Sequence, residues 1–368
     1  MGTGPGSWCD RAPDDHLRLL ITDPFHPVTA PTMIELRGEC PGCQVVAIDT
    51  AAVGRPAPPG VDVVVIAQPP EAEGFVEALC AAAAVYGADT VLPWSDRDAY
   101  AVSRDLGRLS DAGLAVVCPP TVLVELACDK WATVQRLSEL GVPVPGSVLV
   151  YDGAELIKAA CELGYPHRSL VLKPRGLSGG KGVWLLRAGA DPMAGGPFPH
   201  LPVEAMALAL DQCPAAARRA GFVVQHEVSG VDVSVDVLAQ DGHLVAAVAR
   251  TREATLGGLS VQGLVSPLTA GLQDVVRAVV AGLGWSSLAN VQLVMGVGGP
   301  TVYEINPRAA GSIGLNSYAG VDLLSAAIHL ARTGTAPENL GDSVAETVRF
   351  RRYWLDQWWP APAEPGWP

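Results

Sequence analysis

The sequence predicts an α/β domain with a parallel sheet, followed by an α+β domain whose strands are mostly antiparallel. Apolar runs of strand length alternate with helical patterns in the first third of the chain, which is typical of a parallel sheet with helices on both faces. After Pro119-Pro120, apolar runs follow one another across short turns, which favours antiparallel pairing. We expect a flexible N-terminus, two domains and a Trp/Pro-rich tail, at residues 1–15, 16–122, 123–350 and 351–368.

The first domain carries short buried strands separated by helices. We expect the strands at residues 17–22, 45–48, 61–67, 91–92 and 114–117. The helices are expected at 71–86 and 96–106. A nicotinamide site of the Rossmann type needs G-x-G-x-x-G after the first strand, but Asp23-Pro24-Phe25-His26-Pro27 stands there. We therefore expect this domain to be a scaffold or to face the substrate.

The second domain begins with an amphipathic helix at 129–140, which ends at Gly141 with Pro143 just beyond. Further helices are expected at 154–163, 203–213 and 272–283. The strands are expected at 147–150, 170–173, 183–186, 222–226, 231–239, 243–250, 289–295 and 301–305.

Composition excludes several classes of protein. Lys and Arg number 25 against 38 Asp and Glu, a net charge of −13, so we expect no nucleic-acid partner and no anionic membrane surface. No apolar run reaches the length of a membrane span, and the N-terminal residues lack the apolar core of a signal peptide. The CxxC of Cys40 and Cys43 has no second pair at zinc-finger spacing, which favours two inert thiols. We expect a cytoplasmic protein.

A Gly-rich segment follows the strand that ends at Lys173. The segment Gly176–Gly182 contains Gly179, Gly180 and Lys181 and leads into another strand. Glycines allow backbone N–H groups to approach phosphate oxygens, and lysine adds a positive charge. Because Lys181 is followed by glycine and a strand, the segment differs from a Walker A loop. It predicts a hairpin that closes over a triphosphate, with an ordinary hairpin as the alternative.

The run Glu304-Ile-Asn306-Pro-Arg308 is the strongest candidate for chemistry. Side chains alternate along a strand, so Glu304 and Asn306 should share one face, with Tyr303 and Ile305 on the other. Gln292, on the preceding strand, should lie across from them. One carboxylate and two carboxamides beside a guanidinium suit Mg²⁺ bound together with phosphate oxygens. The alternative is a polar strand end that stops at a proline.

A third segment joins an apolar strand to an alternating one through Ser229-Gly230. The backbone of Gln225–Val228 could pair with an adenine edge, and Asp232 could accept hydrogen bonds from a ribose. The alternative is that Asp232 and Asp236 form the solvent face of a strand.

In this order along the chain, these motifs resemble the ATP-grasp superfamily, most like its carbamoyl-phosphate-synthetase-type carboxylate–amine ligases, over about residues 90–330. The resemblance implies an ATP-grasp fold with a lid at about 145–222, preceded by a Rossmann-like domain. It also implies roles for single residues: phosphate binding by Lys130, Lys173, Gly179, Gly180 and Lys181; adenine and ribose binding by Gln225, His226, Val228 and Asp232; metal binding by Gln292, Glu304 and Asn306; and catalysis by Arg308 with Lys173. Many members have a carboxylate where this chain has Gln292.

The resemblance implies an enzyme that joins a carboxylate to an amine through an acylphosphate, with ATP and Mg²⁺ (or Mn²⁺), acting on amino acids or a natural-product precursor. We expect Arg250, Arg252 and Ser312 to contact the substrate, with a surface ion pair as the alternative for the arginines. An ATP-dependent carboxylase and a regulatory module without turnover remain open as functions. The Trp-rich tail leaves open a homodimer or packing on its own chain.

Overall fold

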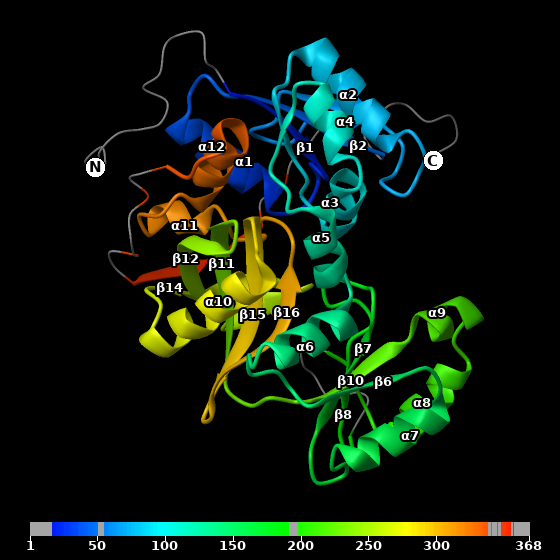
Figure 1. The fold of residues 1–368 in the computed structure, drawn as a ribbon. Coiled ribbons are helices and arrows are strands. Elements are labelled where there is room, and N and C mark those ends of the chain that lie inside the picture. The colour runs from blue at the N-terminus through cyan, green and yellow to red at the C-terminus, as the bar shows by residue number, and fades with distance from the viewer. Residues whose placement is uncertain are drawn as a thin grey trace.

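The computed structural model describes residues 17–50, 55–190, 198–337, 340, 344, 347–354 and 356. Within these residues the strands form three sheets, which we call A, B and C in chain order. Figure 1 shows sheet C between the N-terminal sheet A and the lobe that carries sheet B. The predicted flexible N-terminus, 1–15, and most of the tail, 351–368, lie outside the described residues.

Sheet A is a five-stranded parallel sheet, as the alternating pattern predicts. Its order is β3 (Val63–Ile66), β2 (Gln44–Asp49), β1 (Arg18–Thr22), β4 (Thr90–Leu92), β5 (Ala115–Val116). The surrounding helices are α1 (Thr29–Glu39), α2 (Phe75–Tyr86), α3 (Asp96–Ser103), α4 (Leu106–Asp111) and α5 (Thr121–Cys128). The α/β assignment is confirmed. The helix expected at 96–106 is instead two helices, because Asp105 leaves the helical conformation with φ −126° and ψ 28°.

The central strand β1 is buried on both faces. Leu19 and Ile21 belong to one apolar core with Met33 of α1, whereas Leu20 packs into a second core with Leu79 of α2. This alternation is what a strand covered by helices on both sides requires.

Sheet B is the lobe predicted as the lid. Its order is β6 (Ser147–Val150), β10 (Phe222–His226), β7 (Leu170–Pro174), β8 (Trp184–Leu186), β9 (His200–Leu201). Its helices are α7 (Gly153–Glu162), α8 (Val203–Asp211) and α9 (Ala215–Ala220). Lys173 lies near the end of β7.

Sheet C has seven strands. Its order is β13 (Ala254–Leu256), β14 (Leu259–Ser266), β12 (His243–Thr251), β11 (Val231–Gln240), β15 (Ser287–Gly296), β16 (Gly299–Asn306), and β17 (Val348–Arg351) also pairs with β14. The remaining helices are α6 (Lys130–Glu139), α10 (Ala270–Leu283), α11 (Leu315–Tyr318) and α12 (Leu323–Thr333). Among the described residues, no helix is long and apolar enough to cross a membrane.

The two faces of sheet C pack into different cores. Val235 and Val237 of β11 pack with Val276 of α10 on one face. On the other face, Leu238 shares a core with Leu323 of α12 and with the strands of sheet A. This continuous core holds sheet A against sheet C, so side chains from both can meet at one site.

Glu35 of α1 is a titratable group in this domain contact. Burial, with added repulsion from Asp322 and Glu39, raises its pKa from 4.5 to about 8, and Ser317 of α11 donates a hydrogen bond to it. The folded state therefore favours the protonated acid. Stability should fall as pH rises from about 4.5, where Glu35 ionises in the unfolded chain, through about 8 in the folded chain.

We expect Glu35→Gln to remove this loss, because glutamine does not titrate and still accepts from Ser317. The variant should be more stable than the wild type at pH 8.5 by about 1–2 kcal/mol, an estimate discounted for partial exposure. Urea unfolding at pH 5.0 and 8.5 measures it. Glu162→Gln, on the exposed face of α7, is the control and should keep the wild-type pH dependence. Equal pH dependence in Glu35→Gln and the wild type would contradict the assignment.

Candidate active site

The hairpin of β15 and β16 sets the centre of the site. Its register pairs Gln292 with Glu304 and Asn290 with Asn306. The predicted placement of Gln292 across from Glu304 is therefore confirmed. Glu304 and Asn306 both line the same cleft, as strand alternation predicts.

Tyr303 departs from that alternation. The register shifts between Gln292 and Leu293, because Leu293 pairs with Val302 and Tyr303 is left as an extra residue. Such a bulge re-aims a side chain. Val302 and Ile305 both enter the apolar core, while the Tyr303 ring lies beneath Lys173, with Nζ 4.6 Å from the ring centroid. The expectation that Tyr303 shares the face of Ile305 is thus wrong.

Two lysines flank Glu304. Lys130 opens α6, whose N-cap Asp129 accepts from the backbone of Trp131 and is held by Arg175 at 2.6 Å. The Lys130 Nζ lies 3.3 Å from Glu304 Oε1 and also donates to the Leu177 carbonyl. Lys173 arrives from the end of β7. The structure thus brings together both lysines that the sequence motifs single out.

Burial and mutual charge set the protonation of this group. Burial alone would raise the pKa of Glu304, but Lys130 and then Lys173 outweigh it and hold the pKa below its ordinary value. Burial, opposed by Glu304 and reinforced by Lys130, lowers the pKa of Lys173 to about 8. Glu304 is therefore an anion beside two amines, and Lys173 is close to losing its proton at neutral to basic pH.

The Gly-rich loop reaches over this group from β7. Gly179, Gly180 and Gly182 have φ between 68° and 73°, a region that favours glycine. Gly176, Leu177 and Ser178 line the cleft beside Lys130. Burial, with repulsion from Asp98 and Asp49, raises the pKa of Asp23 in the first domain to about 6, and the charges of Arg97 and Lys181 oppose that rise.

The segment predicted to bind adenine, Gln225–Val228, is held in place by hydrogen bonds of its side chains. Gln225 is 1% exposed and donates to Ser147 Oγ at 3.0 Å, and the His226 ring contacts the Leu163 carbonyl at 3.0 Å. The backbone N–H groups of His226 and Glu227 bond to Gly146 and Ser169. Among the described residues, none accepts a hydrogen bond from the Val228 N–H. His226 is thus a structural contact through its ring, and a ligand would have to use the backbone here.

Asp232 joins a cluster with Tyr303 and Arg252. The Tyr303 hydroxyl donates to Asp232 Oδ1 at 2.8 Å, and Arg252 lies 3.2 Å from that hydroxyl and 3.5 Å from Asp232 Oδ2. Arg252 also donates to the Gly258 carbonyl. Asp232 keeps a side-chain exposure of 37%, so its carboxylate is partly open to solvent.

Two residues expected at the substrate lie inside the protein instead. Arg250 is 1% exposed and pairs with Asp236 at 2.7 Å in the interior of sheet C. Ser312 is 5% exposed. The expectation for Arg250 is corrected: its guanidinium neutralises a buried carboxylate. Ser312 is likewise below the surface. Arg252 is the one of these three that belongs to the site's side-chain cluster.

Arg308 links the two domains. Its Nε lies 3.2 Å from Asp96 Oδ1, and its Nη2 lies 3.4 Å from Asn306 Oδ1. Asp96 is 8% exposed and follows Ser95, which caps α3 in a capping box with Asp98. Sequence reasoning did not select Asp96. The S-x-x-D pattern after an apolar strand predicts that a helix starts here, but it does not predict that Asp96 pairs with Arg308.

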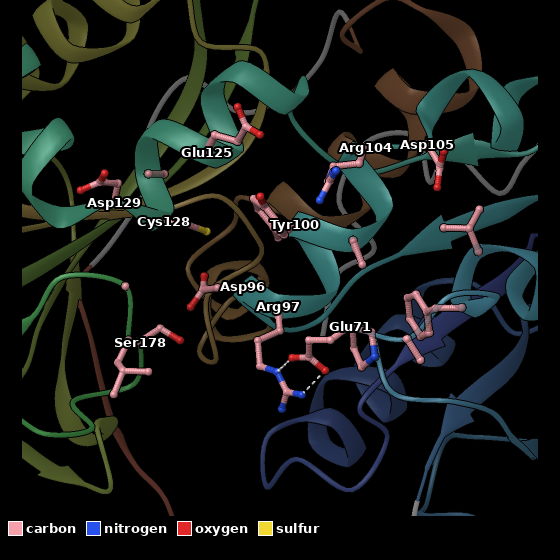
Figure 2. Close-up of a pocket in the computed structure, with 18 of the residues that line it drawn as sticks. Glu71, Asp96, Arg97, Tyr100, Arg104, Asp105, Glu125, Cys128, Asp129 and Ser178 are labelled. Atoms are coloured by element: carbon pink, nitrogen blue, oxygen red, sulfur yellow. Dashed lines mark hydrogen bonds and ion pairs between the residues drawn. The ribbon is translucent and has the colours of Figure 1, made fainter. Parts of the chain in front are cut away.

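A cleft of about 1070 Å³ opens from these residues toward the first domain. Its inner end holds Glu304, Asn306 and Lys130, and its walls come from α2, α3, α5 and the Gly-rich loop. Figure 2 shows the α3 side chains Arg97 and Tyr100 on one wall, with side chains of α5 across the space. A volume of this size accommodates a small-molecule substrate.

The donor set at the inner end suits Mg²⁺ that arrives with phosphate. In the described part of the chain, no three His, Cys, Asp or Glu side chains gather as a metal site. Glu304 offers one carboxylate, and Gln292 and Asn306 offer amide oxygens. Asn306 is 4% exposed, and its Nδ2 has no partner among the described residues. Mg²⁺ accepts such a sparse protein set when phosphate oxygens and water complete its shell.

Comparison with known proteins finds similar sequences and similar folds. A family model described as ATP-grasp in the biosynthetic pathway with Ter operon matches residues 218–352. The carbamoyl phosphate synthase large chain of Streptomyces avermitilis is 27% identical over 241 residues, 62% of this chain and 20% of that protein. Cyanophycin synthetase of Geminocystis herdmanii is 44% identical over 61 residues, 16% of this chain and 7% of that protein. The chain thus spans about a fifth of the carbamoyl phosphate synthases it matches.

Solved structures share the fold at low identity. Biotin carboxylase of Campylobacter jejuni superposes with a TM-score of 0.68 at 16% identity, covering 90% of this chain and 74% of that one. An L-amino acid ligase of Bacillus licheniformis gives 0.61 at 18% identity, covering 86% and 74%. The chain shares the fold of these two enzymes, and its residues 218–352 match the ATP-grasp family model. Carbamoyl phosphate synthase large chains are among its sequence relatives.

Proposed function

We propose that the protein is an ATP-dependent carboxylate–amine ligase that works through an acylphosphate. The observation that carries the proposal is the Glu304 carboxylate held beside Lys130 and Lys173, with Arg308 adjacent, at the inner end of a large cleft. Anionic and cationic groups fixed in this way suit the positioning of a triphosphate and the transfer of its terminal phosphoryl group.

The reaction has two steps. A substrate carboxylate oxygen attacks the γ-phosphorus, the bond from that phosphorus to the bridging oxygen breaks, and ADP leaves. The nitrogen of a neutral amine then attacks the acyl carbon, inorganic phosphate leaves, and the nitrogen gives up a proton to form the amide. Mg²⁺, when bound at Glu304, Asn306 and Gln292, would supply charge neutralisation at the phosphates.

The chain's own groups do the rest. Lys130 and Lys173 would hold phosphate oxygens, and the Gly-rich loop would cover them and exclude water from the acylphosphate. Arg308, oriented by Asp96, would stabilise charge on the transferred group and on the carboxylate beside it. The Val228 N–H, which bonds to none of the described residues, would hold adenine, and the partly exposed Asp232 carboxylate would hold the ribose.

The activities named for two relatives support this chemistry. One sequence relative is a carbamoyl phosphate synthase, and one fold relative is an L-amino acid ligase. We extend from these to substrates of the amino-acid class or a natural-product precursor, with ATP as co-substrate.

ADP release tests the proposal. Purified protein with ATP and Mg²⁺ is given pooled amino acids, single carboxylates, single amines, or bicarbonate. We expect ADP only when a carboxylate and an amine are both present, with a product mass equal to their sum less water. Dependence on bicarbonate instead would indicate a carboxylase, and nucleotide binding without ADP under any condition would indicate a regulatory module.

The low pKa of Lys173 predicts pH-dependent nucleotide affinity. Lys173 carries its charge below about pH 8 and loses it above, so affinity for an ATP analogue should weaken about tenfold from pH 7 to pH 9. Calorimetry with a non-hydrolysable analogue measures this. Lys173→Met should bind weakly at both values, without that slope. A slope that survives in Lys173→Met would show that another group titrates.

A further inference from the structure

A buried polar network lies behind the candidate metal ligands, inside sheet C. Asp236, Arg250, Asn290 and Ser234 have exposures of 0%, 1%, 2% and 3%. They come from three neighbouring strands, β11, β12 and β15. Buried polar groups of this kind keep fixed partners, because an unmade hydrogen bond is costly there.

Asp236 is the acceptor at the base of the network. Arg250 Nη1 donates to its Oδ2 at 2.7 Å, and Asn316 Nδ2 donates to the same oxygen at 2.9 Å. Asn290 Nδ2 donates to Oδ1 at 2.7 Å and to Ser234 Oγ at 2.6 Å. An ionised carboxylate only accepts hydrogen bonds. The Asn290 amide must therefore turn its NH₂ group toward Asp236.

The orientation of the Asn290 amide determines that of Gln292, two residues further along β15. With its NH₂ toward Asp236, Asn290 presents Oδ1 on its other side, where Gln292 Nε2 donates to it at 3.2 Å. The Gln292 nitrogen therefore bonds to Asn290, which leaves the amide oxygen of Gln292 for another partner. The cross-strand neighbour of Gln292 is Glu304. Such pairs have Cβ atoms about 5 Å apart. Carboxylate and amide oxygens are both ligands that Mg²⁺ accepts.

We propose that Asp236 and Asn290 are positioning residues that orient the Gln292 amide so that its oxygen, and not its nitrogen, serves the metal end of the site. This proposal rests on the proposed function in one respect: it requires that a divalent cation binds together with the nucleotide. A carboxylate in place of Gln292 would need no such orientation, because both of its terminal atoms are oxygens. The buried carboxylate thus makes a neutral amide usable as a ligand.

Mn²⁺ binding in the presence of saturating ADP tests the proposal without turnover, by the electron paramagnetic resonance signal of free Mn²⁺. We expect Asn290→Ala to weaken Mn²⁺ binding about tenfold, as loss of an outer partner of a ligand does. Asn316→Ala is the matched control: it removes another amide from Asp236 but none from Gln292, and should bind Mn²⁺ as the wild type does. Circular dichroism and thermal unfolding establish that both variants fold.

Rescue separates orientation from general damage. Gln292→Glu added to Asn290→Ala should restore Mn²⁺ affinity to within about threefold of the wild type, because glutamate offers oxygen whichever way it turns. Three results would overturn the proposal: equal losses in the two asparagine variants, no loss in Asn290→Ala, or no rescue. Absence of Mn²⁺ binding by wild-type protein with ADP would overturn it too. Mn²⁺ binding without ADP formation from any substrates would overturn the ligase proposal alone.

Discussion

Replacing Glu304 with glutamine should lower ADP formation by about 10³-fold or more while leaving the fold in place. Glutamine keeps the volume and the oxygen of the side chain but removes its charge. Lys130 and Lys173 then lose the anion beside them, and the proposed cation site loses its carboxylate. Because phosphoryl transfer depends on fixed charge around the phosphates, the effect should fall on turnover and on metal dependence together.

The measurement is ADP release under the substrate pair that supports turnover, at several Mg²⁺ concentrations. Glu162→Gln is the matched control, since Glu162 lies on the exposed face of α7 in a 4.0 Å pair with Lys158. It should retain wild-type turnover. Thermal unfolding shows whether Glu304→Gln remains folded. A folded Glu304→Gln protein with full activity would refute the assignment of this residue to the metal and phosphates.

Local rules predicted the centre of this site because its geometry is local. Gln292 and Glu304 lie on two strands joined by a short turn, so alternation and turn length were enough to place them across from each other. The same rule failed at Tyr303, because a bulge inserts a residue without any mark in the side-chain pattern. That displacement matters, since it puts the Tyr303 ring under Lys173 and its hydroxyl on Asp232.

The sequence patterns did not predict the helices whose packing partners lie far away in the sequence. Helix α12 has apolar residues on most of one face, but the neighbouring sequence does not indicate what that face packs against. The helix packs against strands of sheets A and C that lie far away in the sequence. The helix α1 contains Pro31 and Thr32, which weaken a helical signal although the proline falls in the first turn. Asp96 reads as a helix start, and only the packing of α3 on the second domain shows that it meets Arg308.

Arg250 illustrates the same limit for charge. In the sequence it stands two residues from Arg252 at a strand end, and both fit a carboxylate-binding role equally well. The register of β11 and β12 places Arg250 opposite Ser234 and within reach of Asp236, inside the sheet. Alternation along β12 puts Arg252 on that side as well, but beyond the pairing, where it reaches Tyr303 and Asp232.

Arg250→Ala should therefore destabilise the protein by about 3–5 kcal/mol, because it leaves the Asp236 carboxylate buried without its cation. Arg252→Ala is the comparison variant: Arg252 is 10% exposed, but its partner Asp232 is 37% exposed and can be solvated, so the cost should be smaller than that of Arg250→Ala. Urea unfolding of the two variants measures the difference. If Arg250→Ala kept wild-type stability and raised only the KM for the carboxylate, the buried pair would be dispensable and a substrate role for Arg250 would return. The expected result is the opposite, because a guanidinium that is 1% exposed and bonded to Asp236 and Ser234 has no surface left for a substrate.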